Sequence, residues 1–554
     1  MVKTAFERGL PSDPVLQPIA REFLEGLMAE MPFLATDLGI HQWDHEMPDL
    51  SPTRRKKWLD LLHQVQSQLA DMEVSRLSAE DRADWVMLSN QVELALIDET
   101  DWNVTKKDPN WYNAVISESL MSLSRRSFGQ THVRAQHLVQ RLRKAPQLLA
   151  SARQLLDNPP LVFVEMAIEQ FPLAVPMIRG LASAFSSIDA DTAKDLEASS
   201  GELISAYEEF VGYLKQRWLP NAHGDYRLGE KRYQERLRWQ EGVEQSLPEL
   251  LERGYQELNR LRTLFAATTT EIDPMASASE VLARMAADVP SRDQVLGSVA
   301  KLVDELKHFV QGHHLLTLAE NQPPLIVETP AYLRMTTLAS ISPVGPFEEE
   351  AKESYFQVTV PEEDSSPSQL SEFNPWTLAI IAAHEVYPGH YGQFLRLAEA
   401  KSTVRKILWS GAFVEGWAHY CEEMLIEAGY GQGNLMMRLA QIQEGLVRVG
   451  RFIVGIRLHT QDMTLDQAQE FFQEACMMGP DSARREALRG TSDPFYLIYT
   501  LGKLDILSLR QSQEQRLGEA FNLQTFHDQL LAHGAPTLAV LGQLLQDAAG
   551  GDRP

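Results

Sequence analysis

Apolar side chains recur every three to four residues along most of the chain, which is the spacing of one face of an α-helix. The pattern is clear in the segments 20–39, 61–72 and 295–311. One short stretch, 355–360 (YFQVTV), has the β-branched and aromatic composition of a strand, and a proline follows it. The sequence therefore predicts a mainly α-helical protein with a small β element. We expect an edge strand there, which could bind an extended peptide or belong to a small sheet without a ligand.

Clusters of Pro, Gly, Ser and charged residues interrupt the helical pattern, and two of the clearest lie at 322–333 and 361–375. We predict loops at these positions. No internal repeat of 20–50 residues is visible. The chain is therefore expected to fold as a single helical catalytic unit over 1–554, in which 1–320 forms mainly a helical shell and 321–554 carries the functional site.

The charge and the cysteine content narrow the classes of partner and compartment. The 554 residues include 51 Lys and Arg against 76 Asp and Glu, for a net charge of −25. Such a charge repels nucleic-acid phosphates and anionic lipids, and no run of about 18 apolar residues is present, so neither nucleic acid nor membrane is an expected partner. The start of the sequence shows no signal-peptide pattern. The two cysteines, Cys421 and Cys476, form no C-x-x-C pair, which favours a reducing cytoplasm.

The segment 376–391 (WTLAIIAAHEVYPGHY) contains two histidines beside a glutamate. Neutral imidazoles bind zinc and a nearby carboxylate can act as base, which is the reason for the H-E-x-x-H pattern of zinc hydrolases. Here His384 and His390 are six residues apart, so on a straight helix their side chains would point about 120° away from each other. Pro388 and Gly389 interrupt the helix between them. We predict that this break turns His390 back toward His384, with Glu385 alongside.

A second motif supplies a third candidate ligand. The segment 413–422 (FVEGWAHYCE) reads as a helix, and Glu415 follows His390 by 25 residues. His/His/Glu zinc sites commonly take their carboxylate from a following helix at about this distance, which leaves a fourth position for water.

These motifs, HEVYPGH at 384–390 and FVEGWAHYCE at 413–422, resemble those of the bacterial domain-of-unknown-function 885 family. The segments 39–51, 493–510 and 521–541 resemble further signatures of that family, so the resemblance covers most of the chain. The family is related by fold similarity to helical zinc metallopeptidases of the gluzincin type. The resemblance thus implies a large α-rich fold with a deep central cleft.

Residue by residue, the resemblance implies His384, His390 and Glu415 as ligands of one Zn²⁺ ion and Glu385 as general base. The chain departs from the family pattern at Tyr391, where many relatives have a second histidine, and at His419, where an aliphatic residue is common.

Four further residues are candidates for supporting roles. His419 could approach the metal or only pack nearby, and Glu422 could orient a ligand histidine or form a salt bridge on a solvated helix. Tyr499 lies in a family-like segment and could stabilise an oxyanion, or its hydroxyl could bond a backbone carbonyl. Lys503, four residues later, is the substitute candidate for the oxyanion role.

The leading functional hypothesis is a cytoplasmic zinc-dependent peptidase that hydrolyses small peptides by metal-activated water, with Glu385 as general base. Two alternatives remain open. The same two histidines and glutamate could hold iron in a non-haem iron enzyme, or the protein could be a catalytically inactive helical peptide-binding protein. Substrate length, end preference and oligomeric state are not predicted by the sequence.

Overall fold

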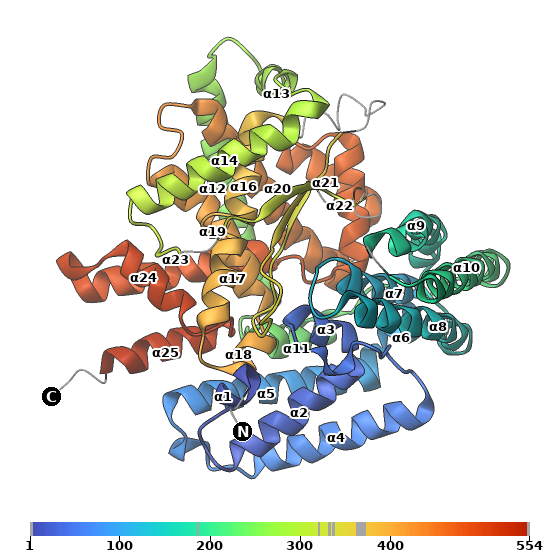
Figure 1. The fold of residues 1–554 in the computed structure, drawn as a ribbon. Coiled ribbons are helices and arrows are strands. Elements are labelled where there is room, and N and C mark those ends of the chain that lie inside the picture. The colour runs from blue at the N-terminus through green and yellow to red at the C-terminus, as the bar shows by residue number, and fades with distance from the viewer. Residues whose placement is uncertain are drawn as a thin grey trace.

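The computed structural model describes residues 4–185, 188–319, 322–330, 334, 338–361 and 373–550. Helices account for 72% of the protein and strands for 3%, which confirms the mainly α-helical class. In Figure 1 the first five helices form a layer along one side of the molecule, and α6–α10 form a bundle that projects to the right. The C-terminal helices surround a small sheet near the centre.

The helices of the N-terminal part are α1 (Ala5–Arg8), α2 (Leu16–Glu30), α3 (Pro32–Leu38), α4 (Pro52–Ala70), α5 (Ala79–Ile97), α6 (Val104–Lys107), α7 (Pro109–Ser124), α8 (Thr131–Leu155), α9 (Leu161–Gly180), α10 (Ala190–Tyr213), α11 (Glu230–Glu241), α12 (Leu247–Ile272), α13 (Ala278–Ala287) and α14 (Arg292–Gly312). Those of the C-terminal part are α16 (Pro375–Glu385), α17 (His390–Glu399), α18 (Thr403–Ile407), α19 (Gly411–Glu427), α20 (Leu435–Thr460), α21 (Leu465–Cys476), α22 (Pro480–Ser492), α23 (Ile498–Leu517), α24 (Leu523–Leu531) and α25 (Leu538–Gly550).

The apolar core has four parts that follow this arrangement. One joins α2, α4 and α5, and a second fills the bundle of α7–α10. The other two lie on either side of the motif helices. One includes residues of α12, α20 and α21, and the other includes residues of α14, the sheet and α24. Residues of α16 and α19 contribute to both. The two motif helices therefore lie where these two cores meet.

The N-terminal and C-terminal parts are held together by buried polar contacts. Arg405 of α18 is 2% exposed, and its Nε donates to Asp84 of α5 at 2.8 Å. The backbone N–H of Thr403 donates to the carbonyl of Gly9 at 2.7 Å. Because a buried charged pair is costly to break, these contacts tie the first helices to the site-bearing half. The predicted division of the chain near residue 320 stays a prediction.

The sheet has three strands, β1 (Leu325–Glu328), β2 (Ala339–Ser342) and β3 (Tyr355–Val358), in the order β1-β3-β2. β3 pairs with β1 in parallel and with β2 in antiparallel. The predicted strand is therefore present but is central, so the expectation of an edge strand at 355–360 is wrong. β1 also lies inside the predicted loop 322–333. It has only four residues and lies between two prolines, so it is too short to show the alternation of apolar and polar residues that is typical of a strand. Of the predicted loop 361–375, residues 362–372 lie outside the described residues.

The edge strand next to the motif helices is β2. The carbonyl of Leu338 accepts from the N–H of Thr359 at 2.8 Å, which sets the alternation of the antiparallel pair. Ser340 and Ser342 then direct their backbone groups toward β3, and Ile341 directs its own away from β3. The outer edge of β2 is thus on the side where its backbone can meet α16.

Within the described residues, one helical segment is long and apolar enough to span a membrane by length and composition alone. It runs over Leu161–Ala184, has a mean hydropathy of 1.6 in its most apolar window, and is 33% buried there. Core helices of soluble proteins pass the same test, and α9 packs on α7 and α10 in its bundle. The segment is weak evidence for a membrane span.

Candidate metal centre

The break between the two histidines is present as predicted. α16 begins after Asn374, whose side chain accepts from the N–H of Thr377, and it ends at Glu385. α17 begins at His390, so the residues between form a turn. The imidazole rings of His384 and His390 consequently lie 4.7 Å apart between centroids and nearly perpendicular, at 86°.

Close backbone packing and one tryptophan hold this turn. A Cβ atom on Gly389 would lie 1.9 Å from the carbonyl oxygen of His384, so a side chain does not fit at this position. The indole N–H of the fully buried Trp417 donates to the carbonyls of Pro388 at 3.0 Å and Gly389 at 3.3 Å. The tryptophan of the FVEGW motif therefore fixes the turn of the HEVYPGH motif.

The second motif brings Glu415 to the two histidines. α19 is capped by Ser410, whose hydroxyl accepts from the N–H of Phe413. The Nε2 atoms of His384 and His390 lie 3.6 Å and 3.3 Å from Oε2 of Glu415. One possible ligand atom from each of these three residues lies within 4.8 Å of the other two. The structure thus brings the three predicted ligands together.

These separations fit a zinc ion. Donors about 2.0–2.1 Å from a tetrahedral ion lie about 3.3–3.4 Å from one another, close to the observed 3.3 Å and 3.6 Å. Burial raises the pKa of Glu415, but the imidazoles of His390 and His384 outweigh burial and hold it well below the usual range. For His384, burial lowers the pKa, yet Glu415 and Glu422 raise it to about 9. A metal binding here would therefore displace a proton.

Glu422 orients His384 through the ring nitrogen that lies away from the ligand cluster. Its Oε1 accepts from Nδ1 of His384 at 2.7 Å and lies 2.9 Å from Nη2 of Arg448. Because Nδ1 of His384 is engaged in this way, Nε2 is left with the lone pair that a metal ligand needs. Glu422 is fully buried, so the alternative of a salt bridge on a solvated helix is wrong. Burial raises its pKa, but Arg448, His419 and His384 together hold it below the usual range.

His419 reaches Glu422 rather than the ligand cluster. Its Nδ1 lies 3.1 Å from Oε2 of Glu422, and the side chain is 0% exposed. Burial lowers the pKa of His419 to about 4, so the imidazole is neutral near pH 7. The structure thus favours the packing alternative over a direct approach to a metal.

Glu385 faces the outer edge of the sheet. Its Oε2 accepts from the backbone N–H of Ile341 at 2.8 Å, and within the described residues no partner is found for Oε1. Burial raises the pKa of Glu385, against the opposing effect of the two histidines. A carboxylate with a raised pKa is better matched to proton transfer near neutral pH.

Tyr499 lies beside the cluster. Its ring is 6.4 Å from the ring of His384 and nearly parallel to it, at 23°. The hydroxyl accepts from Nη2 of Arg489 at 3.3 Å, so the bond is to a side chain and not to a backbone carbonyl. Gly416 and Gly502 let α19 and α23 approach closely, since a Cβ on Gly502 would lie 1.7 Å from a carbonyl of α19.

Lys503 is held elsewhere. Its fully buried ammonium lies 3.0 Å from Oε1 of Glu257 and also pairs with Glu423. Desolvation lowers its pKa, but these two carboxylates raise it above the usual value. With its charge taken up by this ion cluster, Lys503 finds no support as a substitute oxyanion donor.

Sequence reasoning missed two kinds of residue at the site. Ile341 contributes only a backbone N–H, which no side-chain pattern can reveal. Arg448 and Arg451 lie in the apolar helix α20, and Arg489 lies in α22. Arg448 and Arg451 could have been found from the sequence, because they interrupt an apolar helix and arginines are rarely buried unless they are paired.

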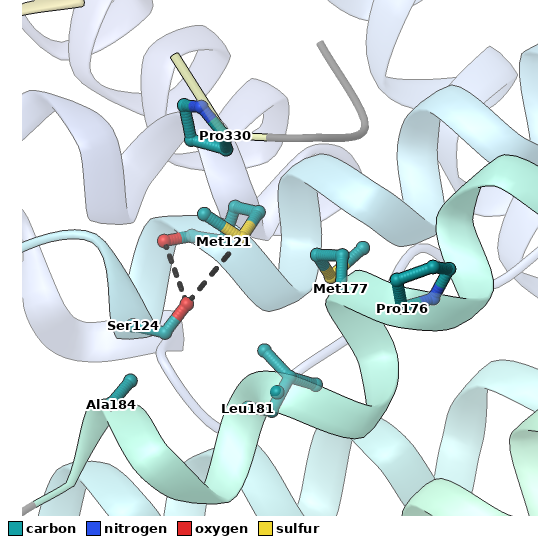
Figure 2. Close-up of a pocket in the computed structure, with 8 residues that line it drawn as sticks. Met121, Ser124, Pro176, Met177, Leu181, Ala184 and Pro330 are labelled. Carbon is teal, nitrogen blue, oxygen red and sulfur yellow. Dashed lines mark hydrogen bonds between the residues drawn. The ribbon is translucent and has the colours of Figure 1, made fainter. Parts of the chain in front are cut away.

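An apolar pocket lies apart from the ligand cluster. Figure 2 shows Met121, Met177 and Leu181 around a pocket of about 280 Å³ between α7 and the end of α9. Pro330, two residues after β1, closes one side. None of the three candidate ligands lines this pocket. The deep central cleft expected at the metal site stays a prediction.

Comparisons with known proteins place the fold. The structure is similar to that of a candidate lipoprotein of unknown function from Shewanella oneidensis, with a TM-score of 0.79 and 23% identity over 97% of this chain and 100% of that chain. It is also similar to a candidate lipoprotein from Colwellia psychrerythraea, with a TM-score of 0.81 and 18% identity over 98% of this chain and 100% of that one. At these identities the likeness shows the fold alone.

The family comparison covers nearly the whole chain. A search of curated proteins finds no match. The family model described as "Bacterial protein of unknown function (DUF885)" matches residues 32–545, which include both motifs. The chain therefore belongs to the DUF885 family of bacterial proteins.

Proposed function

We propose that this protein is a zinc-dependent peptidase that hydrolyses small peptides. The observation that carries the proposal is the convergence of His384, His390 and Glu415, in which the distances from Glu415 to both histidines are close to the edge lengths of a tetrahedral zinc site, with Glu385 beside them. A purely structural cluster has no need of a fourth, adjacent carboxylate with a free oxygen. The expected metal is one zinc ion per chain.

The roles of the residues follow from their contacts. Zinc held by two imidazoles and a carboxylate would activate water and polarise a peptide carbonyl. Glu385, held at Oε2 by the N–H of Ile341, takes the proton of the attacking water at Oε1 and passes it to the leaving amine. Tyr499, whose oxygen accepts from Arg489, keeps its own proton for the oxyanion of the tetrahedral intermediate.

The sheet edge suggests how a peptide would be held. Ile341 directs its backbone away from β3, and its N–H is taken by Glu385. An extended peptide at this edge would use the outward carbonyl of Ile341 as its main-chain hydrogen-bond acceptor. This mode of binding is indifferent to most side chains, so it suits small peptides of varied sequence. It requires an unfolded substrate segment, because a folded protein keeps its backbone groups paired.

Two alternatives use the same geometry. A non-haem iron enzyme would employ the same two histidines and glutamate, but it would give Glu385 no role as base. An inactive peptide-binding protein would retain neither metal nor hydrolysis.

The cytoplasm is the proposed compartment because Cys421 and Cys476 are both free and buried.

The test separates metal binding from chemistry. Glu385→Gln is expected to keep zinc and lose most hydrolysis of a peptide library, whereas Glu415→Ala is expected to lose the metal itself. Glu399→Gln, an exposed glutamate at the end of α17, is the matched control and is expected to keep both. Metal content is measured by mass spectrometry and hydrolysis by chromatography of the digest. Equal metal loss in the first two variants, or undiminished hydrolysis by Glu385→Gln, would overturn the assignment.

A further inference from the structure

Three arginines lie around the ligand cluster and Tyr499, and two of them are fully matched by carboxylates. Arg448 pairs with Glu422 at 2.9 Å and Glu444 at 2.7 Å. Arg451 holds Glu486 through two bonds of 2.7 Å and 2.8 Å. The side chains of Arg448 and Arg451 are 8% and 14% exposed, so both arginines form salt bridges inside the protein and are closed to a ligand.

Arg489 differs from both in its partners and its exposure. Its Nε and Nη2 share a single oxygen of Asp493, at 3.1 Å and 3.0 Å, and Nη2 also donates to the hydroxyl of Tyr499. Within the described residues Nη1 has no hydrogen-bond partner. The side chain is 37% exposed. One edge of this guanidinium is therefore free to bind a ligand.

The position of Arg489 relates that free edge to the metal centre. The carbon Cζ of Arg489 lies 5.9 Å from the centre of the Tyr499 ring, and the ring of His384 lies 6.4 Å from the same centre. The guanidinium and a candidate ligand thus share Tyr499 as a neighbour. A substrate bound at the metal could reach it with one end.

The chemistry of a guanidinium selects the ligand. Arginine is always charged and offers paired N–H donors that match a carboxylate. Asp493, which is 41% exposed, accepts from Nε of Arg489 through one oxygen. Nη1 of Arg489 therefore remains available to bind a second anion. The acidic residues Glu385 and Glu415 near the metal repel other anions, which confines a carboxylate to the Arg489 side.

We propose that Arg489 binds the free C-terminal carboxylate of the peptide substrate, so that the protein acts at the C-terminal end of its substrates. The inference rests on the proposed peptidase function and names its substrate class. The peptide then runs from the outer edge of β2 across the metal centre, with its last residue on the side of Tyr499. A substrate that lacks this charge loses one charge-assisted hydrogen-bonded contact.

The test measures binding without chemistry. In the Glu385→Gln protein, an N-acetylated tetra-alanine peptide with a free C-terminus and its C-terminal amide are titrated by calorimetry. The free acid is expected to bind about tenfold or more tightly than the amide. Adding Arg489→Gln is expected to abolish that ratio, and Arg489→Lys to retain part of it. Arg484→Gln, on the same helix and paired with the exposed Asp466, is the matched control and is expected to keep it.

The outcomes distinguish this inference from the proposed function. Equal affinity for acid and amide, or no measurable binding of the acid, overturns the role of Arg489. A ratio that persists in Arg489→Gln overturns it as well. Hydrolysis of acid and amide at equal rates by the unaltered protein supports a peptidase but contradicts C-terminal selection. Preferential binding of the acid by a protein that hydrolyses neither peptide leaves the carboxylate site standing and overturns the peptidase.

Discussion

Replacing Gly389 with alanine tests whether the turn between the two histidines holds the metal site together. A Cβ at this position would lie 1.9 Å from the carbonyl oxygen of His384 and 2.5 Å from that of Ala383. Both atoms are backbone, so no side-chain rotation can relieve the contact. The first separation must grow to about 3.4 Å or more before the contact becomes an ordinary one.

The magnitude follows from that displacement. Overpacking of this kind costs about 1–3 kcal/mol of folding stability. His390 begins α17 directly after the turn, so it moves with the backbone. Loss of a partner that merely orients a ligand lowers metal affinity about 10–100-fold, and displacing a ligand itself is expected to reach at least the upper end of that range.

The assay compares Gly389→Ala with Gly392→Ala. At Gly392 the nearest atom to a new Cβ is a flexible methyl of Leu316 at 3.3 Å, so the control keeps the same helix without a backbone clash. Zinc affinity by competition with a chromophoric chelator and thermal unfolding of the metal-free protein are measured for both. If Gly389→Ala has the same zinc affinity and the same thermal unfolding midpoint as Gly392→Ala, the turn does not hold the metal site together.

Three further predictions concern single side chains. Glu422→Gln is expected to weaken zinc binding about 10–100-fold in a chelator competition, because the first ligand imidazole loses its anionic partner; unchanged affinity would remove its orienting role. Tyr499→Phe is expected to lower turnover about 10²–10³-fold with metal content intact; turnover within about threefold of the parent would return the hydroxyl to a structural role. Burial lowers the pKa of His41, but Asp44 and Glu348 raise it to about 9. Since this folded-state value lies above the unfolded value of about 6.5, the stabilisation is complete below about pH 6.5 and is lost as the pH rises through about 9. With His41 one third exposed, the loss is about 1 kcal/mol after solvent screening, and urea titrations of the parent and of His41→Gln should differ at pH 6 and converge at pH 10.

The convergence of the three candidate ligands could be predicted from the sequence because they lie in two short motifs. The imidazoles of His384 and His390 needed only the break at Pro388 and Gly389 to face each other, and Glu415 came from the next motif along the chain. Glu422 could be placed because seven residues on a helix return to the same face. These inferences depend on local geometry, which the spacing of residues determines.

Contacts between distant segments could not be predicted in the same way. Ile341 meets Glu385 across 44 residues through a backbone group, and Arg489 of α22 meets Tyr499 of α23 across the turn between these two helices. The position of β3 in the centre of the sheet depended on β1 and β2, whose four-residue lengths carry no pattern. Lys503 shared a helical face with Tyr499, yet the carboxylates of Glu257 and Glu423 hold its charge.

The most direct test of the central claim is the zinc content of the protein, purified without chelators and dialysed against buffered zinc, with His390→Ala treated in parallel. We expect about one zinc per chain in the parent and a small fraction of that in the variant, because the imidazole of His390 lies 3.3 Å from the carboxylate of Glu415 at an edge of the ligand set. A parent protein that binds no more zinc than the variant would contradict the metal centre itself.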